Sequence, residues 1–525
     1  MPKNAIVMMF DSLQHNYVGC YGNDWIKTPN MDRFAKEGVL FENAYTEGLP
    51  TVPCRRAMHT GRYTLPVSGW VALTLDDTTI ADVCWGQGID TAIAFDSPPH
   101  RLPKFGYTRG FDNVMFTHGH ETDASFYSHY PLYEGDPKDY VEDHVLTEAD
   151  SVTGCDVVSP LLEEITNYLK QRQYWKSKED RYVCRTMKKA IKYLETVDRT
   201  CPFFLWIDSF DPHEPWDPPS VYLNYPCPYD PDYKGKNQFL PMMVEVEGVY
   251  TEEELHHIRM LYAELVTLCD EQFGKLLDAV HSLGFEENTM LILVSDHGEP
   301  MGNGEHGHGI MRKVRPWPYE ELAHIPLIIR APGLPAGKRV KGFAQSVDIA
   351  PTVCDWLGLG VQPFHQGFSL LPMARGEVEK VRDFAIAGYH KYSWSIITED
   401  WSYIHWLRDD ERTVNDSMRR IYGDGIIEVS ADVKAVQDDP LWKIKEISNT
   451  ALNEEQRKFQ EAATLDGEDQ WTCTPGSVAS VPERDELYDR RKDPKQLHDV
   501  AAEHPDVAAE LLQKLRLFIQ ELRAS

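Results

Sequence analysis

Three short apolar runs, each followed almost at once by an aspartate, place the strongest constraint on how this chain can fold. The runs are Ala5–Phe10, Phe203–Ile207 and Met290–Val294. The aspartates that follow them are Asp11, Asp208 and, after Ser295, Asp296. Short apolar runs with helical segments between them are typical of buried parallel strands. Any one aspartate could simply end its strand, but the three together favour an α/β sheet with a site at its carboxyl edge.

A long helix is predicted between the second and third runs. Thr251 and Glu254 form a capping box, apolar residues recur to about Val280, and Gly284 ends the pattern. The Tyr-, Asp- and Pro-rich segments on either side of the second run are interpreted as insertions over the sheet. They are residues 120–200 and 217–250.

The pattern changes after Gly376, where alternating apolar and polar residues predict a small antiparallel sheet followed by an amphipathic helix. The alternating segments are Phe384–Ala387, Ser393–Thr398 and Trp401–Trp406, and the helix is Pro505–Leu522. We therefore predict an α/β fold with a large, mostly parallel central sheet sandwiched by helices. The catalytic α/β domain would span residues 1–380, and a smaller α+β subdomain, with the antiparallel sheet and its helix, residues 381–525.

Composition limits the kinds of partner that the protein can bind. The net charge is −30, which argues against nucleic acid and anionic membranes. The apolar run at the N-terminus is too short for a signal peptide or a membrane span, and no later run reaches about 18 residues. Together with ten cysteines that form no CxxC pair, this predicts a cytoplasmic protein with free thiols. An anionic substrate would require positively charged side chains at the site to offset the negative net charge of the protein.

The segment Pro50–Arg62 carries the first residues suited to catalysis. Thr51 stands between two prolines that fix the backbone, and Arg55 follows at the spacing of one helical turn. A helix that begins here would direct free N–H groups and a positive dipole at an anion. Arg55 could then bind a tetrahedral oxyanion with its planar guanidinium. Taken alone, the segment fits a proline-stiffened turn into a surface helix equally well.

Two other segments concentrate histidines and acidic residues. Ser295–Gly298 is followed closely by Gly304–His308, and an adjacent Asp–His pair at a strand end can present one oxygen and one nitrogen to a divalent cation. In Asp208–Pro219, several prolines fix a loop that holds His213, which suits proton transfer or contact with a leaving group. Taken alone, His213 is better explained as a structural histidine.

Together these segments resemble the sulfatase family of the alkaline phosphatase superfamily. In that family a Cys/Ser-x-Pro-x-Arg motif followed by Thr-Gly-Arg carries the nucleophile, and Thr51–Arg55 with Thr60–Arg62 keep this spacing. The other motifs fall in family order between about residues 4 and 520. They are Asp11, Asp211–His213, Asp296–Gly298, Gly304–Gly307, His324–Arg330, Val347–Thr352, Glu486–Asp489 and Asp493–Pro494.

The resemblance implies residue roles as well as the fold. The metal ligands that it implies are Asp11, Thr51, Asp296 and His297. The catalytic candidates are Thr51, Arg55, His213, His306 and Lys313. Arg55 would stabilise the nucleophile and the anion, while His213 and Lys313 would contact the transferred oxyanion or the leaving group.

Thr51 departs from the family motif at the position of the nucleophile. Sulfatases oxidise the first Cys or Ser of the motif to formylglycine, whose hydrate attacks sulfur. Oxidation of Thr51 would give a ketone rather than an aldehyde, and Cys54 is out of register because no proline follows two positions later. Phosphoryl-transfer members of the superfamily instead use a threonine whose hydroxyl is activated by metal coordination. We therefore expect no formylglycine and a plain threonine nucleophile.

The metal site also departs from the arylsulfatase pattern. Ser12 stands where calcium arylsulfatases often carry a second Asp, and His297 replaces a common Asn. A nitrogen ligand shifts the preference from Ca²⁺ toward Mn²⁺, Zn²⁺ or Fe²⁺. A site for a second metal ion is an alternative, less favoured than a site for one ion. Its ligands would be Asp208 or Asp211 with His213 and His306.

The family's Gly-Lys-Trp-His segment corresponds here to Phe95–His100, which lacks the lysine. Asp96 could bind a cationic or hydroxylated substrate group or be a loop residue, and the role of His100 stays open.

We predict a hydrolase of phosphodiesters or phosphonate monoesters, acting on a small anionic ester. The alternatives are a sulfate-ester hydrolase with a nucleophile other than formylglycine and a non-catalytic metal-binding homologue. The sequence names neither the substrate nor the oligomeric state, so a homo-oligomer stays open.

Overall fold

The three apolar runs form neighbouring strands at the middle of one large sheet. The computed structural model describes residues 2–69, 72–74, 76–97, 100, 105–119, 130–154, 156–313, 317–408, 411 and 482–524. The runs become β1 (Asn4–Phe10), β6 (Phe203–Ser209) and β7 (Thr289–Ser295). β1 pairs in parallel with β6 on one side and with β7 on the other. The sequence prediction of a buried parallel sheet is confirmed.

The central sheet has eight strands in the order β11-β2-β10-β7-β1-β6-β4-β5. β10 runs antiparallel to β7 and β2, whereas the other neighbours are parallel. The remaining strands are β2 (Val39–Phe41), β4 (Asp90–Phe95), β5 (Asn113–Phe116), β10 (Leu327–Arg330) and β11 (Lys338–Val340). The sheet is thus mostly parallel, as predicted.

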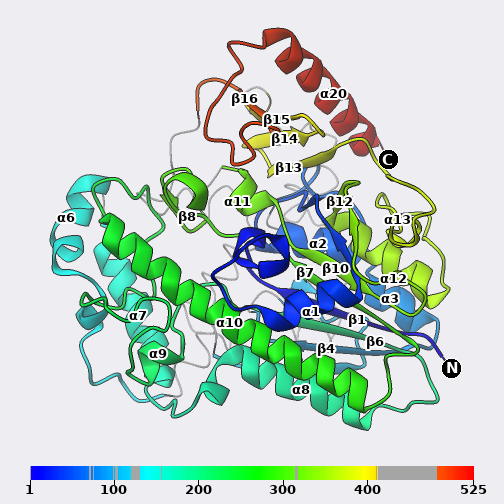
Figure 1. Ribbon diagram of the computed structural model, residues 1–525, viewed down its shortest axis with the longest axis horizontal. Coiled ribbons are helices and arrows are strands. Elements are labelled where there is room, and N and C mark those ends of the chain that lie inside the picture. The colour runs from blue at the N-terminus through cyan, green and yellow to red at the C-terminus, as the bar shows by residue number, and fades with distance from the viewer. Residues whose placement is uncertain are drawn as a thin grey trace, which may run out of the picture.

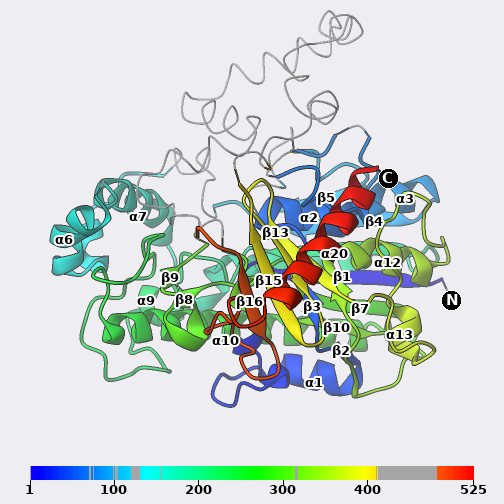
Figure 2. The same cartoon turned by 90° about the horizontal axis from the view of Figure 1, so that it is seen from above.

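Helices cover both faces of this sheet (Figures 1 and 2). Successive residues of β1 point to opposite faces, so Ile6 and Met8 join one core while Val7 and Met9 join the other. The helices of the first core are α1 (Pro29–Glu37), α7 (Val158–Arg172), α8 (Tyr182–Thr196) and α10 (Glu252–Ser282). Those around the second are α2 (Thr51–Thr60), α3 (Ile80–Gly86), α12 (Ile349–Leu357) and α13 (Leu371–Arg375).

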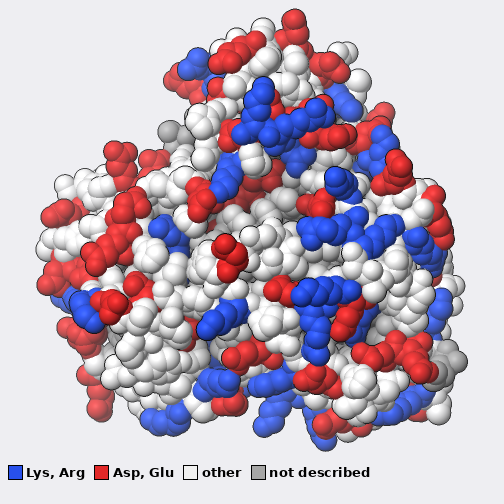
Figure 3. Space-filling model, viewed as in Figure 1, with Lys and Arg blue, Asp and Glu red and all other residues white. Residues whose placement is uncertain are grey.

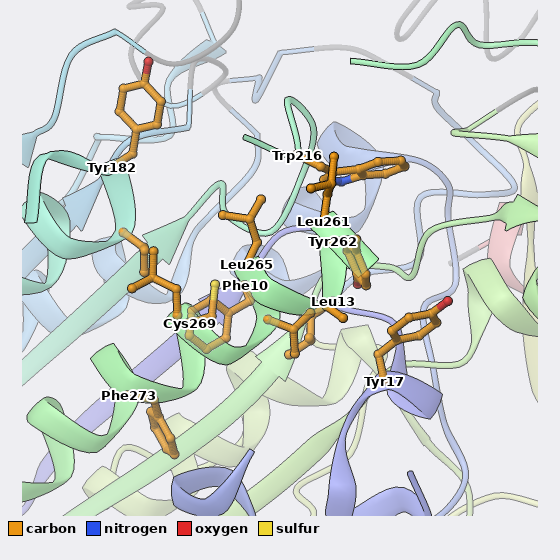
Figure 4. Close-up of a cluster of buried hydrophobic side chains, with 14 of the residues drawn as sticks. Phe10, Leu13, Tyr17, Tyr182, Trp216, Leu261, Tyr262, Leu265, Cys269 and Phe273 are labelled. Atoms are coloured by element: carbon orange, nitrogen blue, oxygen red, sulfur yellow. The ribbon is translucent and has the colours of Figure 1, made fainter. Parts of the chain in front are cut away.

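The long helix α10 confirms the capping prediction. The Thr251 side chain accepts a hydrogen bond from Glu254 N, and the Glu254 carboxylate accepts one from Thr251 N at 2.7 Å. Figure 4 shows residues of this helix, among them Leu261, Tyr262 and Leu265, beside Phe10 and Leu13. The helix therefore packs directly behind the end of β1, where Asp11 follows.

The segment 120–200, interpreted as an insertion, differs from that expectation at its end. α8 packs on β4 and β6 and belongs to the helical layer of the sheet. α6 (Asp143–Thr153), α7 and α9 (Pro219–Tyr222) lie to one side of the sheet (Figure 1), and residues 120–129 and 155 lie outside the described part.

A second, antiparallel sheet follows in the last third of the chain, as predicted. Its order is β13-β14-β15-β16, and α20 (Pro505–Ala524) crosses it (Figure 2). The strands are β13 (Ala385–Tyr389), β14 (Ser393–Ile397), β15 (Trp401–Trp406) and β16 (Glu486–Asp489). Leu511, Leu515 and Ile519 of α20 are buried against it.

Shorter elements surround the sheet edge. They are η6 (Gly304–His306), α11 (Glu320–Ala323), and the two-stranded pairs β3 (Ala44–Tyr45) with β12 (Ala344–Gln345) and β8 (Met301–Gly302) with β9 (Ile310–Met311).

Acidic and basic side chains are interspersed on the face seen in Figure 3, so the net charge does not gather there as one acidic field. Among the described helices, none is both long enough and apolar enough to cross a membrane.

Candidate active site

The three aspartates of the apolar runs meet at one edge of the sheet. Asp11 follows β1, Asp296 follows β7, and Asp208 is the penultimate residue of β6. Because these parallel strands are neighbours, their carboxyl ends lie side by side. All three side chains are fully buried. Thr51, only 3% exposed, begins α2 at the same edge.

Arg55 lies among these carboxylates, one turn into α2. Its Nη1 is 3.0 Å from Asp11 Oδ2 and 2.5 Å from Asp296 Oδ2. Its Nε and Nη2 donate to the two oxygens of Asp208 at 3.0 and 2.8 Å. Burial alone would lower the pKa of Arg55, but the three carboxylates outweigh it and raise that pKa. Arg55 is therefore a permanent buried cation with three anionic partners.

A group of side chains that could bind a metal ion stands beside this arginine. Ligand atoms of Asp11, Asp296 and His297 all lie within 4.8 Å of one another, and all three residues are buried. His297 Nδ1 is 2.8 Å from the Gly298 carbonyl, which can only accept, so Nδ1 carries the proton. His297 Nε2 then keeps its lone pair and lies 3.2 Å from Thr51 Oγ1. This tautomer is the one a metal ligand needs.

The charges of the group fit a divalent cation. If all three aspartates were ionised, they would face one arginine and leave two uncompensated negative charges in a buried place. Burial and the charge of Asp11 raise the pKa of Asp296 well above its usual range. Burial acts in the same direction on Asp11, but Arg55 together with smaller contributions from neighbouring groups, Lys313 among them, outweighs it, so the pKa of Asp11 is lowered. A bound cation would remove the need for Asp296 to hold a proton.

Lys313 is one of the groups whose charge lowers the pKa of Asp11. Lys313 Nζ is 2.8 Å from Glu299 Oε2 and 3.1 Å from Glu214 Oε2. Burial opposes the charge on Lys313, but these two carboxylates outweigh it and raise its pKa. Its ammonium group therefore stays charged.

His213 is held as a neutral ring. Its Nδ1 is 2.7 Å from the Glu214 carbonyl oxygen, and its ring stacks on Phe210 with centroids 4.0 Å apart. Burial lowers the pKa of His213 to about 3. With the proton on Nδ1, His213 offers a lone pair at Nε2, so it can accept a proton there but has none to give.

The residues considered for a second ion are not brought together. Asp208 binds Arg55, and Asp211 binds the buried Arg181, whose Nε is 2.9 Å from Asp211 Oδ1. His306 Nδ1 is 3.0 Å from Tyr17 Oη, in a separate, partly exposed place. Among the described residues, only one group of three ligands has the spacing of a metal site.

The Phe95–His100 segment contributes structure at this edge. Phe210 N donates to Asp96 Oδ1 at 2.5 Å and Thr186 Oγ1 donates to Asp96 Oδ2 at 3.0 Å, so Asp96 is a fully buried structural residue rather than a substrate contact. His100 Nε2 is 3.3 Å from Asp208 Oδ2. Pro98 and Pro99 lie outside the described residues.

The sequence placed Asp208 at this edge but did not identify it as the partner of Arg55, and it did not identify Glu214 and Glu299 as partners of Lys313. The position of Asp208 at a strand end was a signal for the first. The other two are immediate neighbours of motif residues, but nothing local to the sequence links them to Lys313.

Comparison with known proteins shows the family of the chain. The sulfatase family model matches residues 3–359. An arylsulfatase of Clostridium perfringens is 28% identical over 424 residues, covering 75% of this chain and 82% of its own. An N-acetylglucosamine-6-O-sulfatase of Bacteroides thetaiotaomicron is 24% identical over 509 residues, covering 80% and 82%. A multifunctional alkaline phosphatase superfamily protein of Trinickia caryophylli is 26% identical over 431 residues, covering 71% and 78%.

Solved structures share the fold across nearly the whole chain. The phosphonate monoester hydrolase of Agrobacterium radiobacter matches with a TM-score of 0.62 at 20% identity, covering 99% of this chain and 95% of that one. A protein solved with its substrate D-glucosamine-2-N,6-O-disulfate matches with a TM-score of 0.63 at 21% identity, covering 100% and 99%.

The fold and the buried Asp–Asp–His group thus define a hydrolase acting on ester bonds, of the alkaline phosphatase superfamily. Within that superfamily, the chain belongs to the sulfatase family.

Proposed function

We propose that this chain hydrolyses phosphodiesters or phosphonate monoesters, with the Thr51 hydroxyl as nucleophile. The observation that carries the proposal is the place of Thr51 Oγ1. It lies at the first turn of α2 and 3.2 Å from His297 Nε2. That nitrogen is itself 3.9 Å from Asp11 Oδ1 and 3.5 Å from Asp296 Oδ2. When bound, a divalent ion would lower the pKa of this hydroxyl and polarise the ester. The nitrogen ligand favours Mn²⁺, Zn²⁺ or Fe²⁺.

The residues around Thr51 then have separate tasks. Thr51 Oγ releases its proton to solvent and forms a bond to phosphorus as the bond to the leaving oxygen breaks, and that oxygen takes up a proton from solvent. A water then cleaves the phosphothreonine, which releases the product and restores the Thr51 hydroxyl. Arg55 faces the negative charge of the transferred group, while Asp208 holds its guanidinium in place. Lys313 stays charged and suits the departing oxygen, whereas neutral His213 can only accept a proton at Nε2.

The relatives support the class of chemistry rather than one substrate. A phosphonate monoester hydrolase shares the fold, and the relative from Trinickia caryophylli is described as multifunctional. The identity of Thr51 favours phosphorus esters over sulfate esters as substrates. A sulfated threonine has no hemiacetal route for expelling sulfate, whereas a phosphorylated threonine is released by water attack at phosphorus.

The experiment is a comparison of wild type, Thr51→Ala and Thr51→Ser on bis(4-nitrophenyl) phosphate and an aryl phosphonate monoester with Mn²⁺. Thr51→Ala is expected to lose at least about 10³-fold in kcat because it lacks the nucleophile, while retaining part of its Mn²⁺ binding. Thr51→Ser keeps a hydroxyl and should keep measurable turnover. Full activity in Thr51→Ala would refute the assignment.

The second candidate is a sulfate-ester hydrolase, favoured by the arylsulfatase and the N-acetylglucosamine-6-O-sulfatase among the relatives. The same preparation assayed on 4-nitrophenyl sulfate separates the two functions by the ratio of kcat/KM values. A non-catalytic protein would show turnover on neither ester.

A further inference from the structure

One residue of the small C-terminal region joins three elements near the candidate site. Gln496 lies in the loop between β16 and α20, is only 2% exposed, and adopts a left-handed backbone with φ of +57°. Its carbonyl oxygen is 2.6 Å from His308 Nε2. Its side chain accepts a hydrogen bond from Glu320 N at 2.8 Å and donates one to Ser402 Oγ at 2.5 Å. A left-handed conformation at a residue other than glycine persists only where its surroundings fix it.

The residue that contacts the Gln496 carbonyl is His308, in the loop between β8 and β9. Its Nδ1 is 2.8 Å from Glu321 Oε1 and its Nε2 faces the Gln496 carbonyl, so both ring nitrogens meet groups that only accept. Both contacts are hydrogen bonds only when the ring carries two protons. Burial lowers the pKa of His308, but Glu321 outweighs burial and raises it, with Glu486 acting in the same direction. The ring also stacks on Tyr319 with centroids 3.6 Å apart.

The contact between His308 and Gln496 lies between two segments that carry site residues. The loop with His308 continues through β9 into Lys313, and Met311 N donates to Val244 O at 2.9 Å. On the other side, α11 receives a hydrogen bond from Gly298 N on the Leu322 carbonyl at 2.8 Å. Gly298 is also the residue whose carbonyl fixes the tautomer of His297. A shift of α11 or of the loop would therefore move His297 and Lys313 relative to each other.

We infer that His308 and Gln496 are positioning residues, which hold Lys313 and His297 in register by tying the C-terminal loop to the hairpin and to α11. Neither residue contacts the reacting atoms. The inference rests on the proposed metal-dependent hydrolysis for its kinetic consequences, and on the geometry alone for its structural ones.

The test uses the full-length protein and two variants. His308→Phe keeps a ring over Tyr319 but removes both hydrogen bonds. Gln496→Gly suits the positive φ and keeps the backbone acceptor while removing the two side-chain bonds. The matched control is His405→Phe, because His405 also lies between two acceptors, Asp485 and Glu411, at 2.9 and 3.0 Å, but within the C-terminal sheet.

Three measurements are made: steady-state kinetics (kcat and KM) on bis(4-nitrophenyl) phosphate with Mn²⁺, calorimetry for the Kd of Mn²⁺, and hydrogen exchange of the amides of Gly298 and Met311. In His308→Phe and Gln496→Gly we expect kcat to fall about tenfold with KM nearly unchanged, and the Kd for Mn²⁺ to rise about tenfold. Exchange at both amides should accelerate. His405→Phe should lose thermal stability but give wild-type values in all three measurements.

Equal behaviour of His308→Phe and His405→Phe would overturn the inference. If His308→Phe does not fold, His308→Gln, which keeps one donor, replaces it and is expected to fall between wild type and the loss described. If the wild-type protein neither binds Mn²⁺ nor turns over, the proposed function fails. The inference is then decided by exchange at Gly298 and Met311 alone.

Discussion

Replacing Asp208 by asparagine tests the electrostatic design of the site. Asp208 holds Arg55 through two hydrogen bonds of 2.8 and 3.0 Å, with both side chains fully buried. On its other side, Arg55 Nη1 approaches the Asp11 and Asp296 oxygens at 3.0 and 2.5 Å. The arginine thus contacts the same carboxylates that a cation needs. The ion pair with Asp208 weakens the interaction of Arg55 with those carboxylates, and Asp208→Asn removes the negative charge that forms this pair.

The expected sizes follow from these contacts. Removing one partner of a buried ion pair costs about 3–5 kcal/mol. Since Arg55 keeps two carboxylate partners, we expect unfolding free energy to fall by about 2–3 kcal/mol in Asp208→Asn. Arg55 then competes more strongly for Asp11 and Asp296, and the Kd for Mn²⁺ should rise at least about tenfold, equivalent to about 1.4 kcal/mol. Urea denaturation without metal and calorimetric titration with Mn²⁺ measure the two effects.

The control is Asp217→Asn, which disrupts a similar pair away from the metal group. Arg172 Nε and Nη2 are 3.0 and 3.2 Å from the two oxygens of the buried Asp217. This variant should lose comparable stability with unchanged Mn²⁺ affinity. If Asp208→Asn binds Mn²⁺ as tightly as Asp217→Asn does, Arg55 and the cation do not share carboxylates as reasoned here.

Three further outcomes are expected. Burial raises the pKa of Asp96 to about 8, above its ordinary 3.8, so the stability that protonated Asp96 contributes is full below about pH 4 and is lost as pH rises toward 8. Urea denaturation should therefore show the wild type losing up to about 2–3 kcal/mol of unfolding free energy between pH 5.5 and 7.5 relative to Asp96→Asn. Parallel pH profiles of the two proteins would contradict this. A Cβ at Gly298 would lie 2.1 Å from the Glu321 carbonyl oxygen, so Gly298→Ala should lower both Tm and kcat, and a variant with wild-type kcat would speak against a fixed Gly298. Mn²⁺ at a hundred times its Kd should add about 2.7 kcal/mol of stability, reversed by a chelator, and a Tm indifferent to chelation would count against the metal group.

The parts of the fold that local pattern encodes were predictable. The apolar runs and capping residues predicted β1, β6, β7 and α10, because burial on both faces and a satisfied helix end depend on neighbouring residues. The resemblance to the sulfatase family implied that Asp11, Asp296 and His297 would meet, and the structure brings them together. The pairing of Asp208 with Arg55 was not predictable, since it depends on how α2 crosses the sheet edge. The apparent fit of Asp208 and Asp211 to a second ion failed for the same reason: arginines from elsewhere in the fold bind both.

The buried charges around Thr51 also bear on the kind of ester that fits. Five carboxylates lie at the site among the described residues, namely Asp11, Asp208, Asp296, Glu214 and Glu299, and they face the cations Arg55, Arg312 and Lys313. With all five carboxylates ionised, a divalent ion would bring these eight side chains to neutrality, so they offer no surplus positive charge to a substrate. A dianionic phosphate monoester would then be bound less favourably than a singly charged group. Phosphodiesters, phosphonate monoesters and sulfate esters all carry one charge at the transferred group. Among these, a threonine that cannot become formylglycine favours the phosphorus esters, whose covalent intermediate water can cleave.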